Sequence, residues 1–156
     1  MSVMIEGDLF DPALYAATLA DFSAARTLPA WCYTDADVHR REIERCFRPN
    51  WHFIGHESEV PEPGAYISTD LVIGPVIVIR GQDGEVRAFA NTCRHRGARL
   101  LEAGHGRCKT IVCPYHAWTY NQTGELRGAP AMNEVPGFSR KDWGLHGLRL
   151  GRYEGF

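Results

Sequence analysis

The sequence predicts a mostly β domain preceded by N-terminal helices. From Trp51 onward, apolar residues come in short runs separated by Gly, Pro, Asn and Asp, which is typical of strands joined by tight turns. Upstream of Pro49, apolar residues recur at helical spacing instead. Two short motifs that each combine a cysteine and a histidine lie between the predicted strands. We therefore divide the chain into a helical extension, residues 1–48, and a β domain, residues 49–156.

The first predicted helix begins near the N-terminus. Asp11 can cap it and Pro12 suits its first position. Tyr15, Leu19 and Phe22 then recur on one helical face. This spacing predicts a peripheral amphipathic helix.

A second helix is predicted over Val38 to Phe47. The acidic segment Thr34-Asp35-Ala36-Asp37 precedes it, and Arg45 and Arg48 lie near its end, as the helix dipole favours. Pro49 lacks a backbone N–H group and ends the helix.

The β domain is predicted from short extended runs. These runs are Trp51–Gly55, Ala65–Ser68, Val76–Arg80, Glu85–Ala90, Thr110–Val112, Ala117–Tyr120 and Glu125–Arg127. Two tight hairpin turns are expected at 82–84 and 121–124, each with a glycine where a positive φ is wanted.

Composition excludes several classes of function. The chain has 156 residues, enough for a real core, and a formal net charge of -2, which argues against a general nucleic-acid binder. The longest apolar run, Leu71–Ile79, contains Gly74 and Pro75 and is far shorter than the roughly 20 residues of a membrane helix. Met1–Phe10 lacks the pattern of a secretory signal. We therefore expect a cytoplasmic protein without a membrane or nucleic-acid partner.

The two motifs supply two thiolates and two imidazoles. Cys93-Arg94-His95 is followed, after seventeen residues, by Cys113-Pro114-Tyr115-His116. Each pair is so close in sequence that it must lie on one tight loop, and two such loops suit a 2Fe-2S cluster ligated by two cysteines and two histidines. A structural zinc ion uses the same donor atoms. Zinc fingers usually place both cysteines on one hairpin and both histidines on a helix, so the mixed pairs favour the cluster.

The remaining cysteines are not assigned to the site. An odd total of five in a chain expected to be cytoplasmic is poor support for a disulfide framework. Cys32, Cys46 and Cys108 are therefore interpreted as small packing residues.

The motifs carry a resemblance to a known family. Cys93-x-His95-Arg96-Gly97 together with the segment 113–118 (CPYHAW) resembles the Rieske domain of ring-hydroxylating oxygenase α subunits. The segments 51–56 (WHFIGH), 61–64 (PEPG) and 91–92 (NT) also look like this family. The resemblance covers about residues 29–156, so residues 49–156 are expected to be a Rieske 2Fe-2S domain.

The resemblance implies a fold and a ligand set. The fold is a Rieske-type iron–sulfur fold of stacked antiparallel sheets with two cluster-binding hairpin loops. Cys93 and Cys113 would bind the inner iron, and His95 and His116 the outer iron nearer the surface. The residues expected to surround these ligands are Arg96, Gly97, Tyr115 and Trp118.

Two further residues indicate the branch of the family. Rieske proteins of respiratory complexes carry an extra cysteine in each loop, and these form a disulfide. Ala98 and Tyr115 stand at those positions here. The chain therefore resembles the oxygenase and ferredoxin branch.

The resemblance also implies partners. A Rieske oxygenase accepts electrons from a reductase or ferredoxin and passes them to a mononuclear non-haem Fe(II) in a catalytic domain of the same or a neighbouring subunit. His116 would face a carboxylate of that domain. The expected protein is a homo-oligomer, a trimer by family analogy, and this segment is expected to contribute electron transfer to an oxidoreductase, without catalytic residues of its own.

The catalytic domain itself is expected to be missing from this sequence. The close pair His52 and His56 lies in the predicted β region without the helical acid of a 2-His-1-carboxylate site. Glu154-Gly155-Phe156 resembles the start of a family strand, so we expect the N-terminal part of a longer oxygenase. The alternatives are a freestanding Rieske ferredoxin and, less favoured, a zinc module. The long N-terminal extension argues against the ferredoxin.

A basic segment surrounds the motifs. Its five members are Arg94, Arg96, Arg99, Arg107 and Lys109. These charges either steer an acidic redox partner or pair with carboxylates of their own domain or of a catalytic domain, and we favour pairing.

Overall fold

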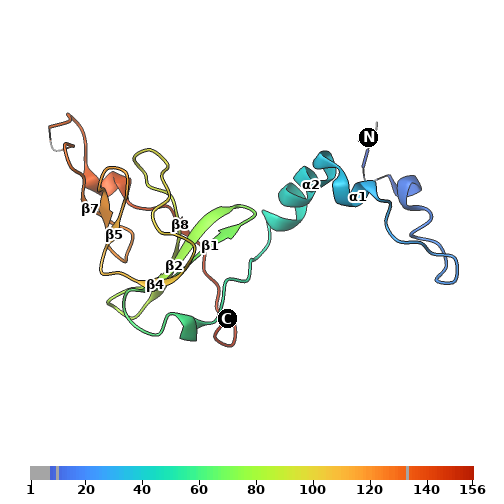
Figure 1. Ribbon diagram of the computed structural model, residues 1–156, viewed down its shortest axis with the longest axis horizontal. Helices are drawn as coiled ribbons and strands as arrows, with labels where there is room; N and C mark the ends of the chain where they lie inside the picture. Colours follow the sequence, from blue (N-terminus) through green and yellow to red (C-terminus); the bar gives the residue numbers. More distant parts are fainter. Residues whose placement is uncertain (1–7, 10, 133) are drawn as a thin grey trace. The chain divides into compact units, whose positions relative to one another are not determined.

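The computed structural model describes residues 8, 9, 11–132 and 134–156. The chain divides into two compact units, Met1–Trp51 and His52–Phe156 (Figure 1). The boundary predicted after residue 48 lies close to this division.

The N-terminal unit contains short helical elements. They are the 3-10 helix η1 (Pro12–Tyr15), the helices α1 (Trp31–Thr34) and α2 (Ala36–Glu42), and the π-helical turn η2 (Ile43–Phe47). Asp35 caps α2, because its Oδ1 accepts hydrogen bonds from the N–H groups of Asp37 and Val38. The second predicted helix is therefore present, although it begins earlier and its last turn is π-helical.

The first predicted helix is wrong beyond Tyr15. Asp11 and Pro12 start it as expected, but only the single turn η1 forms. Leu19 and Phe22 are exposed, so no apolar contact sustains a longer helix. The chain turns back instead, and the N–H group of Arg26 donates to the carbonyl oxygen of Ala17 at 2.9 Å.

The second unit is built from two antiparallel sheets, as predicted. One sheet has the strand order β4-β1-β2-β3-β8 and the other β5-β6-β7. Its elements are η3 (Glu57–Glu59), β1 (Ala65–Leu71), β2 (Gly74–Arg80), β3 (Val86–Ala90), β4 (Gly104–Arg107), β5 (Ile111–Val112), β6 (Thr119–Tyr120), β7 (Leu126–Gly128), η4 (Arg140–Trp143) and β8 (Gly147–Leu148).

Differences from the prediction lie at the edges. The strand predicted over Trp51–Gly55 does not form, and Phe53 within it is exposed and pairs with no strand. The edge strands β4 and β8 were not predicted. Gly84 (φ +82°) and Gly124 (φ +84°) adopt the left-handed conformation expected of the two hairpin turns.

The main core contains both cysteines of the motifs. Ile77 and Ile79 of β2 and Phe89 of β3 pack in one buried cluster with Cys93 and Cys113. The sulfur atoms are thus supplied from the interior of the unit. In the described part of the chain, no helix is long and apolar enough to span a bilayer.

Candidate metal centre

Two loops with matching hydrogen-bond patterns carry the four predicted ligands. Loop 1 comprises residues 93–98 and loop 2 residues 113–118. In each loop, the carbonyl oxygen of the first residue accepts from the N–H group of the fifth, at 2.9 Å in loop 1 and 3.0 Å in loop 2. The N–H group of the first residue donates to the carbonyl oxygen of the sixth, at 2.8 Å in both loops. The two loops therefore present their side chains from similarly rigid turns.

Antiparallel pairs close both loops at their base. Thr92 pairs with Arg99 below loop 1, and Val112 pairs with Thr119 below loop 2. The fifth residue of loop 1, Gly97, has a φ of +71°, which a glycine adopts without strain. The role of Gly97 is therefore to allow the turn.

Loop 2 has an alanine at the corresponding position. Ala117 has a φ of +56°, a conformation that costs an L-residue free energy. The sequence reasoning did not find this strained position, since the surrounding letters give no signal of it.

The two cysteines are deeply buried. Cys93 is 2% exposed and Cys113 is 3% exposed. Burial raises the pKa of the Cys93 thiol, and the neighbouring thiol of Cys113 adds to the increase. A buried thiolate without a counter-charge is unfavourable, so a metal ion would stabilise the form that binds it.

The two histidines face one another. The centroids of the His95 and His116 rings are 4.7 Å apart, and the ring planes meet at 72°. The Nδ1 atoms of both rings are buried and have no hydrogen-bond partner among the described residues. Burial lowers the pKa of His95, which favours the neutral imidazole with a free lone pair. Buried polar atoms without partners are rare, so these two nitrogens fit metal ligands.

The four donors match the ligand set of a two-iron centre. In a 2Fe-2S cluster of this type, each iron takes only two protein ligands. Two thiols and two orphaned imidazole nitrogens are the donor set that such a cluster requires.

The other predicted site residues lie around the histidines. The buried Trp118 ring stacks on His95, with centroids 4.9 Å apart and an interplanar angle of 7°. Tyr115 is 61% exposed, and its ring centroid lies 3.8 Å from that of His116. Arg96 is exposed beside His95, and its charge contributes to the lowered pKa of that histidine.

Sequence reasoning missed the role of Tyr120. Its buried hydroxyl group lies 3.4 Å from Sγ of Cys93 and accepts a hydrogen bond from the N–H group of Arg94 at 3.1 Å. Tyr120 lies 27 residues after Cys93. No local sequence pattern predicts this contact.

Asn91 was noted only as part of the family-like segment. Its Oδ1 accepts hydrogen bonds from the N–H groups of Leu100 (3.1 Å) and Leu101 (2.9 Å). Its Nδ2 donates to Oγ of Ser68 at 2.9 Å and to the carbonyl oxygen of Leu101. This buried amide fastens the end of loop 1 to β1.

Two of the five members of the basic segment are paired with carboxylates of the protein. Arg99 binds Asp70 at 2.6 Å, and Arg107 binds Glu62 at 2.6 Å. The pairing interpretation holds for these two arginines.

Two members of the basic segment differ from the paired ones. In the described part of the chain, Arg96 and Lys109 have no carboxylate partner. Both are exposed. They are the positive charges of this segment that stay available to a partner.

The unassigned cysteines are all free thiols. Cys32 and Cys108 are partly buried, as expected of packing residues, but Cys46 is exposed, so that interpretation is wrong for it.

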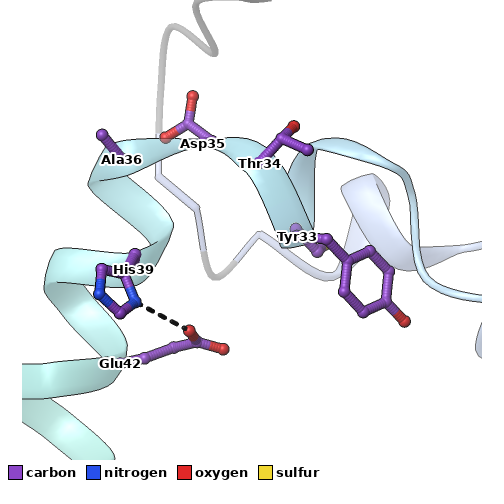
Figure 2. A pocket seen from close by; sticks show the side chains of 7 residues that line it. Tyr33, Thr34, Asp35, Ala36, His39 and Glu42 are labelled. Carbon is purple, nitrogen blue, oxygen red and sulfur yellow. Dashed lines mark ion pairs between the residues drawn. The ribbon is translucent and has the colours of Figure 1, made fainter. Parts of the chain in front are cut away.

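An open hollow of about 410 Å³ lies in the N-terminal unit (Figure 2). Cys32, His39 and Glu42 line it, and Nδ1 of His39 lies 3.9 Å from Oε2 of Glu42. It belongs to neither loop.

A family profile matches the part of the chain that contains both loops. Residues 50–139 match the Rieske [2Fe-2S] domain profile. The chain belongs to this family. The resemblance and the fold class expected from the sequence are confirmed, and the cofactor of this Rieske domain is a 2Fe-2S cluster, so the zinc alternative is dismissed.

Curated relatives of the Rieske domain are oxygenase α subunits. The chain is 37% identical over 140 residues to biphenyl 2,3-dioxygenase subunit alpha of Rhodococcus jostii, covering 89% of this chain and 30% of that protein. It is 38% identical over 138 residues to benzene 1,2-dioxygenase subunit alpha of Pseudomonas putida, covering 88% and 30%. The chain thus spans less than a third of the length of these relatives.

Solved structures share the fold. A naphthalene 1,2-dioxygenase from Rhodococcus sp. bound to indole has a TM-score of 0.79 and 38% identity, covering 92% of this chain and 33% of that one. A quaternary ammonium Rieske monooxygenase in complex with gamma-butyrobetaine has a TM-score of 0.78 and 36% identity, covering 85% and 38%.

Proposed function

We propose that this Rieske domain transfers single electrons through a 2Fe-2S cluster held by Cys93, His95, Cys113 and His116. The observation that carries the proposal is the meeting of two buried thiols with two buried, unpartnered Nδ1 atoms on matched loops. The cluster supplies one-electron oxidation and reduction when bound. The protein supplies the donor atoms and keeps them in place.

Burial supports the division of the ligands between the two irons. The cysteines lie in the core, whereas both histidine side chains are partly exposed. We therefore assign the thiolates to the inner iron and the imidazoles to the outer iron. In this arrangement the imidazole edges are the shortest route for an electron between cluster and surface.

The proposed physiological role is electron delivery within an oxygenase. The electrons would come from a reductase or ferredoxin and pass to a mononuclear non-haem iron in a catalytic domain of the same or a neighbouring subunit. Support comes from relatives that are oxygenase α subunits and from a related monooxygenase described as using inter-subunit electron transfer. We accordingly propose a homo-oligomer, a trimer by analogy, working in the cytoplasm.

The proposed whole protein is an oxidoreductase that oxygenates a small organic substrate. The relatives named above act on biphenyl, benzene and quaternary ammonium compounds, so the family match does not narrow the substrate to one chemical class. No residue of this Rieske domain is assigned a bond-making role. Residues 1–48 are proposed to be an extension that takes no part in cluster binding.

Ligand substitution tests the proposal. The purified protein is expected to contain two iron and two sulfide per chain, to be coloured, and to bleach reversibly on reduction. Cys113→Ala and His116→Ala are each expected to abolish the visible absorption. Cys32→Ala, in the N-terminal unit, serves as the matched control and should retain it. An intact spectrum in Cys113→Ala would refute the ligand assignment.

Reduction by a protein partner tests the proposed role in electron transfer separately from the binding of the cluster. The oxidised protein is mixed with a reduced ferredoxin of an aromatic-ring dioxygenase system, and bleaching is followed by stopped flow. Fast, saturable bleaching is the expected result. A protein that holds its cluster but accepts electrons only from small chemical reductants would contradict the proposed role while leaving the ligands intact.

A further inference from the structure

The two histidine ligands differ in what supports them. The ring of His95 lies parallel to that of Trp118, which is 2% exposed and cannot move without disturbing the core. The ring of His116 instead contacts Tyr115, a neighbour in its own loop that is largely exposed. One imidazole is therefore supported by the interior and the other by a surface side chain.

Trp118 is itself held from behind by two further rings. Its centroid lies 5.7 Å from that of Trp143 at an interplanar angle of 85°, and 5.8 Å from that of Phe138 at 66°. Phe138 and Trp143 stack on one another with centroids 6.0 Å apart. Edge-to-face and offset contacts of this kind are the favoured geometries of aromatic pairs. We call Trp118, Phe138 and Trp143 the aromatic brace.

Arg94 connects Trp143 back to loop 1. Its guanidinium carbon lies 5.7 Å from the Trp143 ring centroid, within cation–π range, and its Nη1 donates to the carbonyl oxygen of Gly144 at 2.8 Å. Arg94 immediately precedes His95 in loop 1. The chain of contacts from His95 through Trp118 and Trp143 thus returns to the residue beside His95.

The brace links loop 1 to η4. Trp143 ends η4, which packs against β7, and lies beyond residue 139, where the family-profile match ends. Ring contacts of Trp143 reach only the other two brace residues and Arg94 among the described residues, so any effect on His95 is indirect.

We propose that η4 is a positioning element. Through the aromatic brace, to which it contributes Trp143, it fixes the ring plane of His95 and so makes the binding of the two histidine ligands to iron inequivalent. The inference rests on the proposed ligand assignment. The overlap of a ligand nitrogen with iron depends on ring orientation, and outer contacts orient metal-bound histidines. Loosening the brace should therefore change the magnetic coupling between the cluster and the nitrogen of one histidine, and leave the coupling of the other histidine unchanged.

Pulsed electron paramagnetic resonance of the reduced protein, labelled with 15N-histidine, tests this directly. The wild type is expected to show two distinct nitrogen couplings. Trp143→Leu is expected to shift or broaden one of them and to leave the other unchanged, whereas Trp143→Phe keeps a ring and restores the wild-type pair. Trp31→Leu, the same substitution in the N-terminal unit, is the control and should change neither coupling.

A purely structural role for Trp143 would lower thermal stability without moving a coupling. Unchanged couplings in Trp143→Leu, or an equal displacement of both, would overturn the inference. Arg94→Lys provides a second variant that preserves the charge but removes the planar guanidinium. It is expected to shift the same one of the two nitrogen couplings. A wild-type protein without nitrogen couplings would instead contradict the proposed histidine ligands.

Discussion

The buried hydroxyl group of Tyr120 lies 3.4 Å from Sγ of Cys93. The same oxygen accepts a hydrogen bond from the N–H group of Arg94, so its own proton is free to point at the sulfur. A thiolate that binds iron has no proton to donate, and Tyr120 must therefore be the donor in this pair. A hydrogen bond to sulfur stabilises the more negative, reduced cluster.

Removal of this hydroxyl group should lower the reduction potential. Tyr120→Phe is expected to shift the midpoint downward by on the order of 50 mV, since a hydrogen bond to a charged group contributes about 1–3 kcal/mol and about 1.4 kcal/mol corresponds to 59 mV for one electron. A spectroelectrochemical titration measures the shift. Tyr33→Phe, in the N-terminal unit, is the control, and an unchanged or higher potential in Tyr120→Phe would contradict the donor assignment.

Asn91 should be important for stability. Asn91→Ala leaves the N–H groups of Leu100 and Leu101 without their partner in a buried position, which should cost about 2–4 kcal/mol. The expected readout is a lower midpoint of thermal unfolding, followed by circular dichroism. Thr110→Ala, at an exposed position, should stay within about 0.5 kcal/mol of wild type. Equal effects of the two substitutions would contradict a stabilising role of the Asn91 amide.

Arg96 should matter for association with an acidic redox partner. Its exposed charge has no carboxylate partner among residues that the structure describes, whereas Arg107 is paired with Glu62. Arg96→Gln is expected to slow reduction by an acidic ferredoxin about two- to five-fold at low ionic strength, and the difference should vanish at high salt. Arg107→Gln removes the same charge and should have less effect. A wild-type rate independent of salt would remove the steering idea.

Asp83 should contribute a small pH-dependent stability. Hydrogen bonds from the Arg87 guanidinium hold the pKa of its carboxyl group at about 2, below the ordinary 3.8. Because the folded-state pKa is the lower one, the stabilisation is present above about pH 4 and is lost as the pH falls toward 2. Asp83→Asn and Arg87→Gln should each flatten the fall in unfolding temperature over this range. A slope as steep as in wild type would show that the pair does not contribute.

Strands could be predicted where the pattern of strand-forming residues and the turn signals beside them agreed. β2 and β3 combine β-branched or aromatic residues with the tight turn at Gly84, so local signals sufficed to predict them. β4 has the sequence Gly-His-Gly-Arg and forms only because it pairs with β1, a tertiary effect that no local pattern contains. Trp51–Gly55 fails for the opposite reason, since its residues suit a strand but pair with no neighbouring strand.

The candidate ligands were predictable because their spacing alone demands two tight loops. Tyr120 lies 27 residues after Cys93, and Trp143 lies still farther along the chain from His95. Only the folded chain brings them to the site.

Mössbauer spectroscopy of the oxidised, 57Fe-enriched protein examines the two irons separately. Two quadrupole doublets of equal area are expected, one from an iron with two thiolate ligands and one from an iron with two imidazole ligands. A single doublet would mean two equivalent irons. That result would contradict the assignment of Cys93 and Cys113 to one iron and His95 and His116 to the other.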